Sequence, residues 1–471
     1  MTSKPGFLDR TLTHLRSAWK DLAQNSACPI DLNLSEDCPE EQHLCLLEQM
    51  QACLDARGGD VAARQGAAQL GNAYLGLNDT GKRRFLLLLA AHFDIDSQQV
   101  EQSLLQYQQA ELEPERRRKL KQLRNLLDAP RRQLLTQFNA LPQGVKFLVD
   151  MRADMRRLIE PEDHQLRDLE QDLQELLIAW FDVGFLKLKR VSWDSPASLL
   201  EKLIEYEAVH EIRNWDDLKH RLTADRRLFA FFHPNMTGEP LIFIQVALVQ
   251  GLATNIQAVL DETQQPLDPQ HADTAAFYSI SNAQKGLQGI SFGNFLIKRV
   301  VSELSREFPN LRQFSTLSPI PGFLHWLTSA VAGNSRGLIS IEEWQAIKSL
   351  APADSTAPLI DLLSQPGWHL NEDNNQLLQP MLERLCSHYL LHEKRRGHQT
   401  LDPVAHFHLS NGARIEQLNW LADRSERGLS RSAGLMVNYL YDLEKIEGNS
   451  EGYSAEGNIN VAESITRKLS A

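Results

Sequence analysis

The chain has 471 residues, of which 42% are hydrophobic and 23% charged, and its formal net charge is −12 at pH 7. This length and composition predict a globular protein of two or more domains. The acidic balance disfavours general binding to nucleic acids, and no apolar run approaches the roughly 20 residues that span a membrane.

The cysteines indicate a reducing environment. Four of the five, Cys28, Cys38, Cys45 and Cys53, fall early in the chain, and the fifth is Cys386. The odd count, with a first segment that lacks the apolar core of a secretion signal, predicts a cytoplasmic protein. No Cys-x-x-Cys pair is present, so buried free thiols are favoured over a zinc site.

Residues 1–180 follow the pattern of successive amphipathic helices and are predicted to form a helical bundle. Asp96 is suited to cap one of these helices. Helices are expected at 144–158 and 164–180. A single continuous helix is expected over 116–138, with an apolar stripe formed by Leu120, Leu123, Leu127, Leu134 and Leu135.

From about residue 181 the pattern changes to that of a domain with both strands and helices. His233 to Glu239 has the turn residues of a hairpin between two apolar runs, and the second run is apolar enough for a central strand. Helices are expected over 341–396. Strands are expected at 228–232, 240–248, 274–280, 407–409 and 414–421. The sequence therefore predicts an α+β multidomain protein, with a helical domain over 1–180 and a mixed α/β domain over 181–471.

A glycine-rich loop from Gln284 to Asn294 leads directly into an amphipathic helix. The first turn of a helix leaves main-chain N–H groups without partners, and this favours an anion such as phosphate. The loop matches neither the P-loop nor the dinucleotide-binding fingerprint. It is compatible with a phosphate-bearing ligand and equally with an ordinary glycine-rich turn.

Two further segments carry reactive side chains. Ser318 lies in the segment STLSPIPGF, where two prolines and a glycine restrict the backbone. His408 precedes Asn411–Gly412, a hairpin signal, so we expect it at the end of a strand beside a tight turn. Tyr441 could bond a ligand oxygen. Each residue also has a purely structural interpretation, and no Gly-x-Ser-x-Gly motif supports a hydrolase triad.

At these residues the chain closely resembles the malonyl-CoA decarboxylase family. The matching segments include FYSIS, GLQG, FLIKRVV, LSPIPGF, EKRRG, FHL followed by NGA, and GLM followed by NY, and they occur in the same order from about residue 181 onward. The N-terminal 180 residues resemble the helical domain of that family more loosely.

This resemblance implies a catalytic domain with the fold of acyl-CoA N-acyltransferases, and no metal or organic cofactor. It places the catalytic roles on Ser318 and His408. It places Ser279 and Tyr441 near the malonyl group. The loop that binds the CoA portion corresponds to Gln288, Gly289, Ile290, Ser291, Phe292, Gly293 and Asn294. Animal members carry a glutamate at the position aligned with Ser291, so the resemblance assigns no role to that side chain here.

The resemblance further implies malonyl-CoA as the substrate and self-association through the helical domain, as a dimer or tetramer, without nucleic acid or membrane partners. The expected reaction yields acetyl-CoA and CO2. Two alternatives stay open at this point: an acyl-CoA-dependent acyltransferase of the same fold, and a non-catalytic acyl-CoA-binding sensor.

Overall fold

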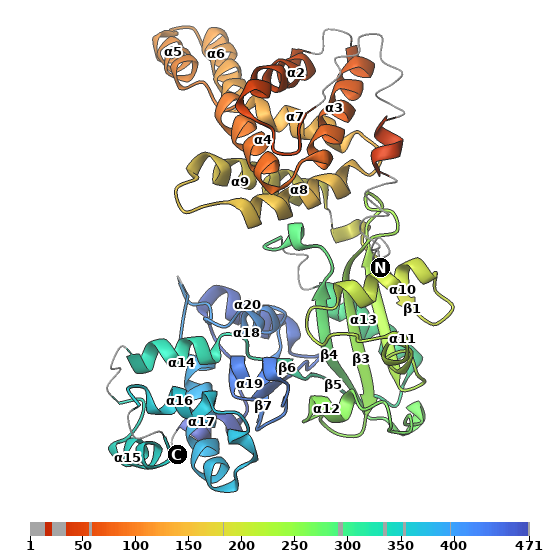
Figure 1. Cartoon of the computed structure of the whole chain (residues 1–471), viewed down its shortest axis with the longest axis vertical. Helices are drawn as coiled ribbons and strands as arrows, with labels where there is room; N and C mark the ends of the chain where they lie inside the picture. The colour runs from red at the N-terminus through yellow and green to blue at the C-terminus, as the bar shows by residue number, and fades with distance from the viewer. Residues whose placement is uncertain are drawn as a thin grey trace.

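The computed structural model describes residues 15–20, 34–55, 59–181, 183–290, 295–332, 337–351, 355–395 and 397–469. Figure 1 shows three parts: a helical region formed by the N-terminal residues, a part built on strands β1 to β5, and a largely helical part formed by the C-terminal residues. Within the described ranges, no helix is both long and apolar enough to cross a membrane.

Every regular element described before residue 181 is helical. Residues 15–20 are helical, and the further elements are η1 (Glu40–Gln42), α2 (His43–Asp55), α3 (Gly59–Gly76), α4 (Asp79–His92), α5 (Ser97–Gln109), α6 (Glu113–Leu126), α7 (Pro130–Asn139), α8 (Gly144–Leu158) and α9 (His164–Trp180). The predicted cap at Asp96 is confirmed, because its side chain accepts from the main-chain N–H groups of Gln98 and Gln99. The predicted bounds of α8 and α9 are also confirmed.

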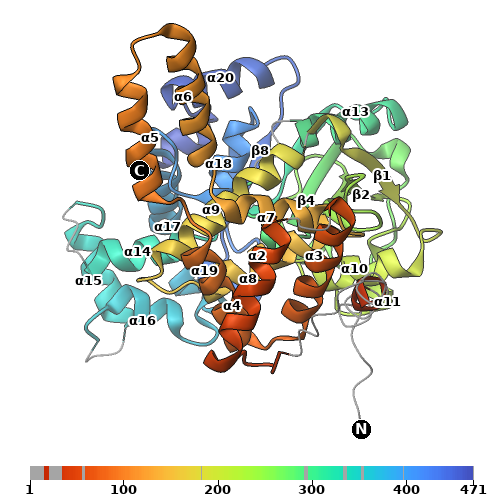
Figure 2. The same ribbon diagram turned by 90° about the horizontal axis from the view of Figure 1, so that it is seen from above.

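The prediction of one continuous helix over 116–138 is wrong. Helix α6 ends at Leu126, and α7 starts at Pro130, whose ring suits the first turn of a helix. The predicted stripe is also only partly a core face. Leu134 and Leu135 are buried, whereas Leu120 is 50% exposed and Leu127 53% exposed. Helices α5 and α6 form a hairpin that projects from the helical region in both views (Figures 1 and 2).

Among the described residues, eight strands form one mixed sheet in the order β1-β2-β3-β4-β5-β8-β6, with β7 paired to β8. The strands are β1 (Lys187–Val191), β2 (Arg226–Phe232), β3 (Pro240–Val249), β4 (Thr274–Asn282), β5 (Gln313–Thr316), β6 (Ser318–Pro319), β7 (Arg414–Asn419) and β8 (Met436–Leu440). The predicted hairpin between β2 and β3 is confirmed, and β3 is a central strand paired on both sides. The predicted fold class, a helical N-terminal region followed by a mixed-sheet domain, is confirmed.

Helices cover the sheet and fill the C-terminal part. They are α10 (Ala197–Tyr206), α11 (Trp215–His220), α12 (Ile256–Val259), α13 (Phe295–Glu307), α14 (Phe323–Ala332), α15 (Ile341–Leu350), α16 (Pro358–Ser364), α17 (Glu372–His392), α18 (Pro403–Ser410), α19 (Glu426–Ser432), α20 (Ile446–Glu456) and α21 (Glu463–Leu469). Short 3-10 turns complete the chain at η2 (Val183–Phe185), η3 (Pro269–His271), η4 (Lys285–Leu287) and η5 (Trp368–Leu370). The predicted helices within 341–396 are therefore present.

The predicted strand at 407–409 is wrong, because these residues belong to helix α18. The signal for this helix was the pair Asp402–Pro403: the Asp402 carboxylate accepts from the N–H groups of Val404 and Ala405, and proline occupies the first turn. Gly412 has a φ of +81°, which lets the chain turn from α18 into β7, and a Cβ there would meet the carbonyl oxygen of Ile446 at 2.0 Å.

Candidate active site between the diverging strands

The sheet opens where strands β4 and β5 stop pairing. The two strands run parallel as far as Phe277 and Thr316, and the N–H of Leu317 still donates to the carbonyl of Phe277 at 2.9 Å. The chain then leaves β4, and Ser318 and Pro319 pair with β8 instead. Strand β4 continues to Asn282 beside β3. A cavity of about 680 Å³ lies at this divergence and is lined by residues of both segments.

Ser318 and His408 meet at this cavity, although 90 positions separate them in the chain. Ser318 Oγ lies 3.1 Å from His408 Nε2, and both side chains are buried yet line the cavity. His408 is carried by the last turn of α18, and Ser318 by the short strand β6. The structure therefore brings together the two residues that the sequence singled out as reactive.

Hydrogen bonds fix both members of the pair. Ser318 Oγ donates to Thr316 Oγ1 at 2.8 Å, and Thr316 Oγ1 also accepts the main-chain N–H of Tyr439 at 3.1 Å. On the far side of the imidazole, His408 Nδ1 lies 2.7 Å from the Tyr441 hydroxyl. Each ring nitrogen of His408 therefore has a buried oxygen partner, which holds the ring in one orientation.

Burial keeps this cluster uncharged. It lowers the pKa of His408 to about 3 and raises the pKa of Tyr441 well above its usual value. The charged form of each group is disfavoured because it would lose its hydration. Near neutral pH the cluster of Ser318, His408 and Tyr441 therefore consists of a neutral imidazole and two hydroxyl groups.

Asp402 connects the segment that carries Ser318 to the helix that carries His408. One carboxylate oxygen caps the start of α18, and the other accepts the N–H of Gly322 at 3.4 Å and the hydroxyl of Tyr389 at 3.3 Å. The side chain is fully buried, and burial raises the pKa of its carboxyl group. Sequence reasoning missed this residue, although the Asp402–Pro403 pair is a helix-start signal that could have pointed to it.

Ser279 lines the cavity from β4, but its hydroxyl is already engaged. It donates to both carboxylate oxygens of Glu207 at 2.9 Å, and Ser281 donates to the same carboxylate at 3.0 Å. A bulge in β4 places Ser279 opposite Gln245, since Phe277 pairs with Val246 and Tyr278 is the extra residue. Glu207, to which the sequence analysis assigned no role, therefore orders the end of β4 beside the cavity.

The beginning of the predicted CoA-binding loop lines the same cavity. Gln288, Gly289 and Ile290 contribute to its wall, and Gly289 has a φ of +82°. Ser291, Phe292, Gly293 and Asn294 lie outside the described residues. Tyr441 reaches the site through His408, as its hydroxyl lies on the side of the imidazole opposite Ser318.

Side chains of the helical region donate hydrogen bonds to main-chain carbonyls of this loop. Arg152 of α8 donates from Nη1 to the carbonyl oxygens of Gly286, at 2.6 Å, and Gln288, at 3.0 Å. Gln174 of α9 donates to the carbonyl of Gly289 at 3.3 Å. A Cβ at Gly286 would lie 1.8 Å from the carbonyl oxygen of Val149, so the loop packs directly against α8.

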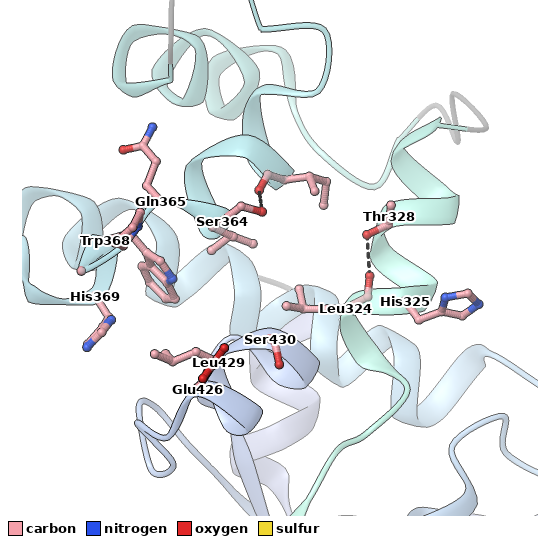
Figure 3. A pocket seen from close by; sticks show the side chains of 14 residues that line it. Leu324, His325, Thr328, Ser364, Gln365, Trp368, His369, Glu426, Leu429 and Ser430 are labelled. Carbon is pink, nitrogen blue, oxygen red and sulfur yellow. Dashed lines mark hydrogen bonds between the residues drawn. The ribbon is translucent and has the colours of Figure 1, made fainter.

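A larger cavity of about 830 Å³ lies elsewhere, between α14, α16, η5 and α19. Figure 3 shows its lining, which includes Leu324, Trp368 and Leu429. The hydroxyls of Thr328 and Ser364 in this cavity donate to carbonyls of their own helices. None of the predicted site residues lines it, so the cavity at the strand divergence is the candidate active site.

The described residues contain no group of three or more His, Cys, Asp or Glu side chains that could hold a metal ion. Of the five cysteines, Cys38, Cys53 and Cys386 are buried free thiols and Cys45 is exposed, while Cys28 lies outside the described residues. The expectation of buried free thiols is therefore met at three of the four described positions.

Comparison with known proteins gives one consistent family. A model described as the malonyl-CoA decarboxylase C-terminal domain matches residues 184–471, and one described as the N-terminal domain matches residues 93–181. The mitochondrial malonyl-CoA decarboxylase of Mus musculus is 42% identical over 413 residues, which cover 83% of this chain and 82% of that protein.

Solved structures agree. The crystal structure of malonyl-CoA decarboxylase from Rhodopseudomonas palustris has a TM-score of 0.83 at 38% identity and covers 90% of this chain and 99% of its own. That from Agrobacterium vitis has a TM-score of 0.80 at 36% identity, with 90% and 99% covered. The chain therefore belongs to the malonyl-CoA decarboxylase family.

Proposed function

We propose that this protein converts malonyl-CoA to acetyl-CoA and CO2 in the cavity between β4 and β6. The observation that carries the proposal is the buried contact between Ser318 Oγ and His408 Nε2 at the wall of this cavity, in a chain of the malonyl-CoA decarboxylase family. Breaking the bond between the malonyl carboxylate and C2 releases CO2 and leaves its electron pair on C2. The adjacent thioester carbonyl accepts that pair as an enolate.

Ser318 is suited to orient the malonyl carboxylate, because its hydroxyl hydrogen, which is donated to Thr316 Oγ1 in this structure, can turn to the carboxylate while His408 Nε2 holds the hydroxyl oxygen in place. The enolate then takes one proton at C2, and this gives acetyl-CoA. His408 is the side chain suited to deliver it. Solvent supplies the proton that each turnover consumes.

The pKa of His408 bears on how this transfer begins. Burial holds that pKa at about 3, so the imidazole is neutral. A substrate carboxylate beside the ring raises the pKa, because a neighbouring negative charge stabilises the imidazolium. We therefore propose that His408 becomes a proton donor only when the anionic substrate is bound. The thioester carbonyl supplies the electron sink, so we also propose that no metal or organic cofactor takes part.

The test is a reaction of the purified protein with malonyl-CoA and no acyl acceptor, in which CO2 and acetyl-CoA are measured together. Equal amounts of both products are expected, and dialysis against a chelator should leave the rate unchanged. His408→Ala should lower kcat by about 100-fold or more, the scale of general acid catalysis. Ser318→Ala should also lower kcat.

His369→Ala, in the larger cavity, is the matched control and should keep the wild-type rate. Tight CoA binding without any product would instead indicate a non-catalytic sensor. Product formation only after an amine is added would indicate an acyltransferase. An unchanged rate in His408→Ala would remove His408 from the mechanism.

We further propose that the protein self-associates through the hairpin of α5 and α6. The support is a set of exposed leucines on a projecting element: Leu105 is 55% exposed, Leu112 68% and Leu120 50%. None of the 14 residues of α6 is buried. Exposed apolar side chains of this kind are typical of an association surface. Leu105→Glu with Leu120→Glu should shift the mass measured by light scattering toward the monomer, and unchanged mass would place the interface elsewhere.

A further inference from the structure

The charged residues that line the cavity with Ser318 and His408 are basic, whereas the chain as a whole is acidic. The chain carries a net charge of −12. The described residues that line the cavity nevertheless include two arginines, Arg156 and Arg395, and no aspartate or glutamate. The charged side chains of the lining are therefore cationic, as a site for an anionic ligand requires.

Arg156 does not come from the sheet domain. It belongs to α8 in the helical region and lies beside the start of the glycine-rich loop, where its Nη2 donates to Gln288 Oε1 at 3.2 Å. Its Nη1 lies 3.3 Å from Glu170 Oε1, and its side chain is 37% exposed. A guanidinium group has five N–H donors, so these two long contacts leave several donors free to bind a ligand.

The charge near Arg156 is not neutralised by its neighbours. Glu170 is shared with Arg152, which is fully buried and lies 2.8 Å from the same carboxylate oxygen. Two guanidinium groups therefore face one carboxylate, which leaves an excess positive charge. Arg152 is directed to the main-chain carbonyls of Gly286 and Gln288. Arg156 is the member of the pair that lines the cavity.

We infer that Arg156 binds a phosphate group of the CoA moiety, so that the helical region supplies part of the substrate site. This inference rests on the proposed function, which places the thioester at Ser318 and His408. The phosphates of an extended CoA must then lie away from that pair, and Arg156 lies beside Gln288 and Gly289 at the loop. Guanidinium groups bind phosphate oxygens through two parallel hydrogen bonds.

The malonyl group also carries a negative charge, and the test must separate the two anions. Malonyl-pantetheine keeps the malonyl carboxylate and the thioester but has none of the CoA phosphates. Arg156→Ala should raise the KM for malonyl-CoA by about tenfold, the scale of one charge-assisted hydrogen bond, with kcat within about twofold. The same substitution should leave kcat/KM for malonyl-pantetheine unchanged.

Arg157→Ala is the matched control, because Arg157 is the next residue of α8, pairs with Asp79 and Asp154, and does not line the cavity. It should leave the KM for both substrates at the wild-type value. An equal loss with both substrates in Arg156→Ala would assign Arg156 to the malonyl end and overturn the inference. An unchanged KM for malonyl-CoA would also overturn it.

Calorimetric titration with CoA and with pantetheine makes the test independent of turnover. Weaker CoA binding by Arg156→Ala, with equal pantetheine binding, supports the inference even if the wild-type protein releases no CO2. In that case the proposed decarboxylation fails and the phosphate contact stands. Equal CoA affinity in the two proteins overturns the phosphate contact, whatever the activity.

Discussion

The imidazole of His408 is stacked on the phenol ring of Tyr439, with ring centroids 4.5 Å apart and ring planes inclined by 24°. Tyr439 lies in β8, and its main-chain N–H donates to Thr316 Oγ1, the group that accepts from Ser318. Strand β8 therefore positions both members of the reactive pair, one by packing and the other through a threonine hydroxyl.

The Tyr439 ring, and not its hydroxyl, is expected to matter for activity. The hydroxyl is buried without a hydrogen-bond partner among the described residues. Tyr439→Phe should therefore keep kcat within about twofold and raise the free energy of unfolding by about 1 kcal/mol, because it removes an unsatisfied buried group. Tyr439→Leu removes the stacked ring and should lower kcat by about tenfold or more, with KM little changed. Equal losses of kcat in both variants would show that the hydroxyl itself takes part.

His408 should make stability depend on pH in the acid range. Its pKa is about 3 in the folded protein and about 6.5 in the unfolded chain. Between these values the unfolded chain binds one more proton than the folded protein. The contribution is therefore fully present above about pH 6.5 and is lost as pH falls toward 3, at up to ~1.4 kcal/mol per pH unit.

Denaturant unfolding of wild type and His408→Gln at several pH values between 7 and 4.5 measures this contribution. The wild-type free energy of unfolding should fall more steeply with decreasing pH, and the difference between the two slopes should approach one proton. Parallel curves for the two proteins would contradict a neutral, buried His408.

Contact between the glycine-rich loop and the helical region should be sensitive to one methyl group at Gly286. A Cβ there would lie 1.8 Å from the Val149 carbonyl oxygen, so Gly286→Ala must push the loop off α8. We expect a loss of about 2 kcal/mol or more in stability and a raised KM for malonyl-CoA.

Gly448→Ala is the control for this substitution. Gly448 lies in α20 and a Cβ there meets nothing within 4 Å, so the change should stabilise the protein by about 0.5–1 kcal/mol. Chemical denaturation and steady-state kinetics of both variants provide the measurement. A Gly286→Ala protein with wild-type stability and KM would refute the tight packing.

Asp402 is expected to affect the rate of the reaction as well as the stability that it gives as the cap of α18. Asp402→Ala removes the cap of α18 and the contact to Gly322, so it should cost at least ~1 kcal/mol of stability and lower kcat. Asn371→Ala removes a comparable cap from α17, whose Asn371 side chain accepts from two main-chain N–H groups. It should show a similar loss from capping with kcat unchanged. If both variants have the same kcat, Asp402 is a cap alone.

Local patterns explain which elements could be predicted from the sequence. The bounds of α8 and α9 followed from amphipathic periodicity, and β2 and β3 from apolar runs around turn residues. Around His408, apolar and polar residues alternate over a few positions, and this alternation wrongly predicts a strand. The capping pair Asp402–Pro403 outweighs that short alternation.

Residues whose partners lie far away in the sequence cannot be predicted from local patterns. Arg152 reaches main-chain carbonyls 134 and 136 positions away, and Glu207 receives the Ser279 hydroxyl from 72 positions away. No local spacing encodes these pairs. The leucines of α6 show a second limit of prediction from sequence. Periodicity predicts that a helix has an apolar face, but it does not predict whether other residues of the same chain cover that face.

The position of β8 has a consequence for protein synthesis. This strand is among the last regular elements of the chain, yet it lies between β5 and β7 and also pairs with β6. A nascent chain still on the ribosome that has passed His408 but not Tyr439 and Tyr441 holds both reactive residues without the strand that aligns them. The contact between Ser318 and His408 can therefore be aligned only after β8 has been synthesised, when the helical region has had time to fold.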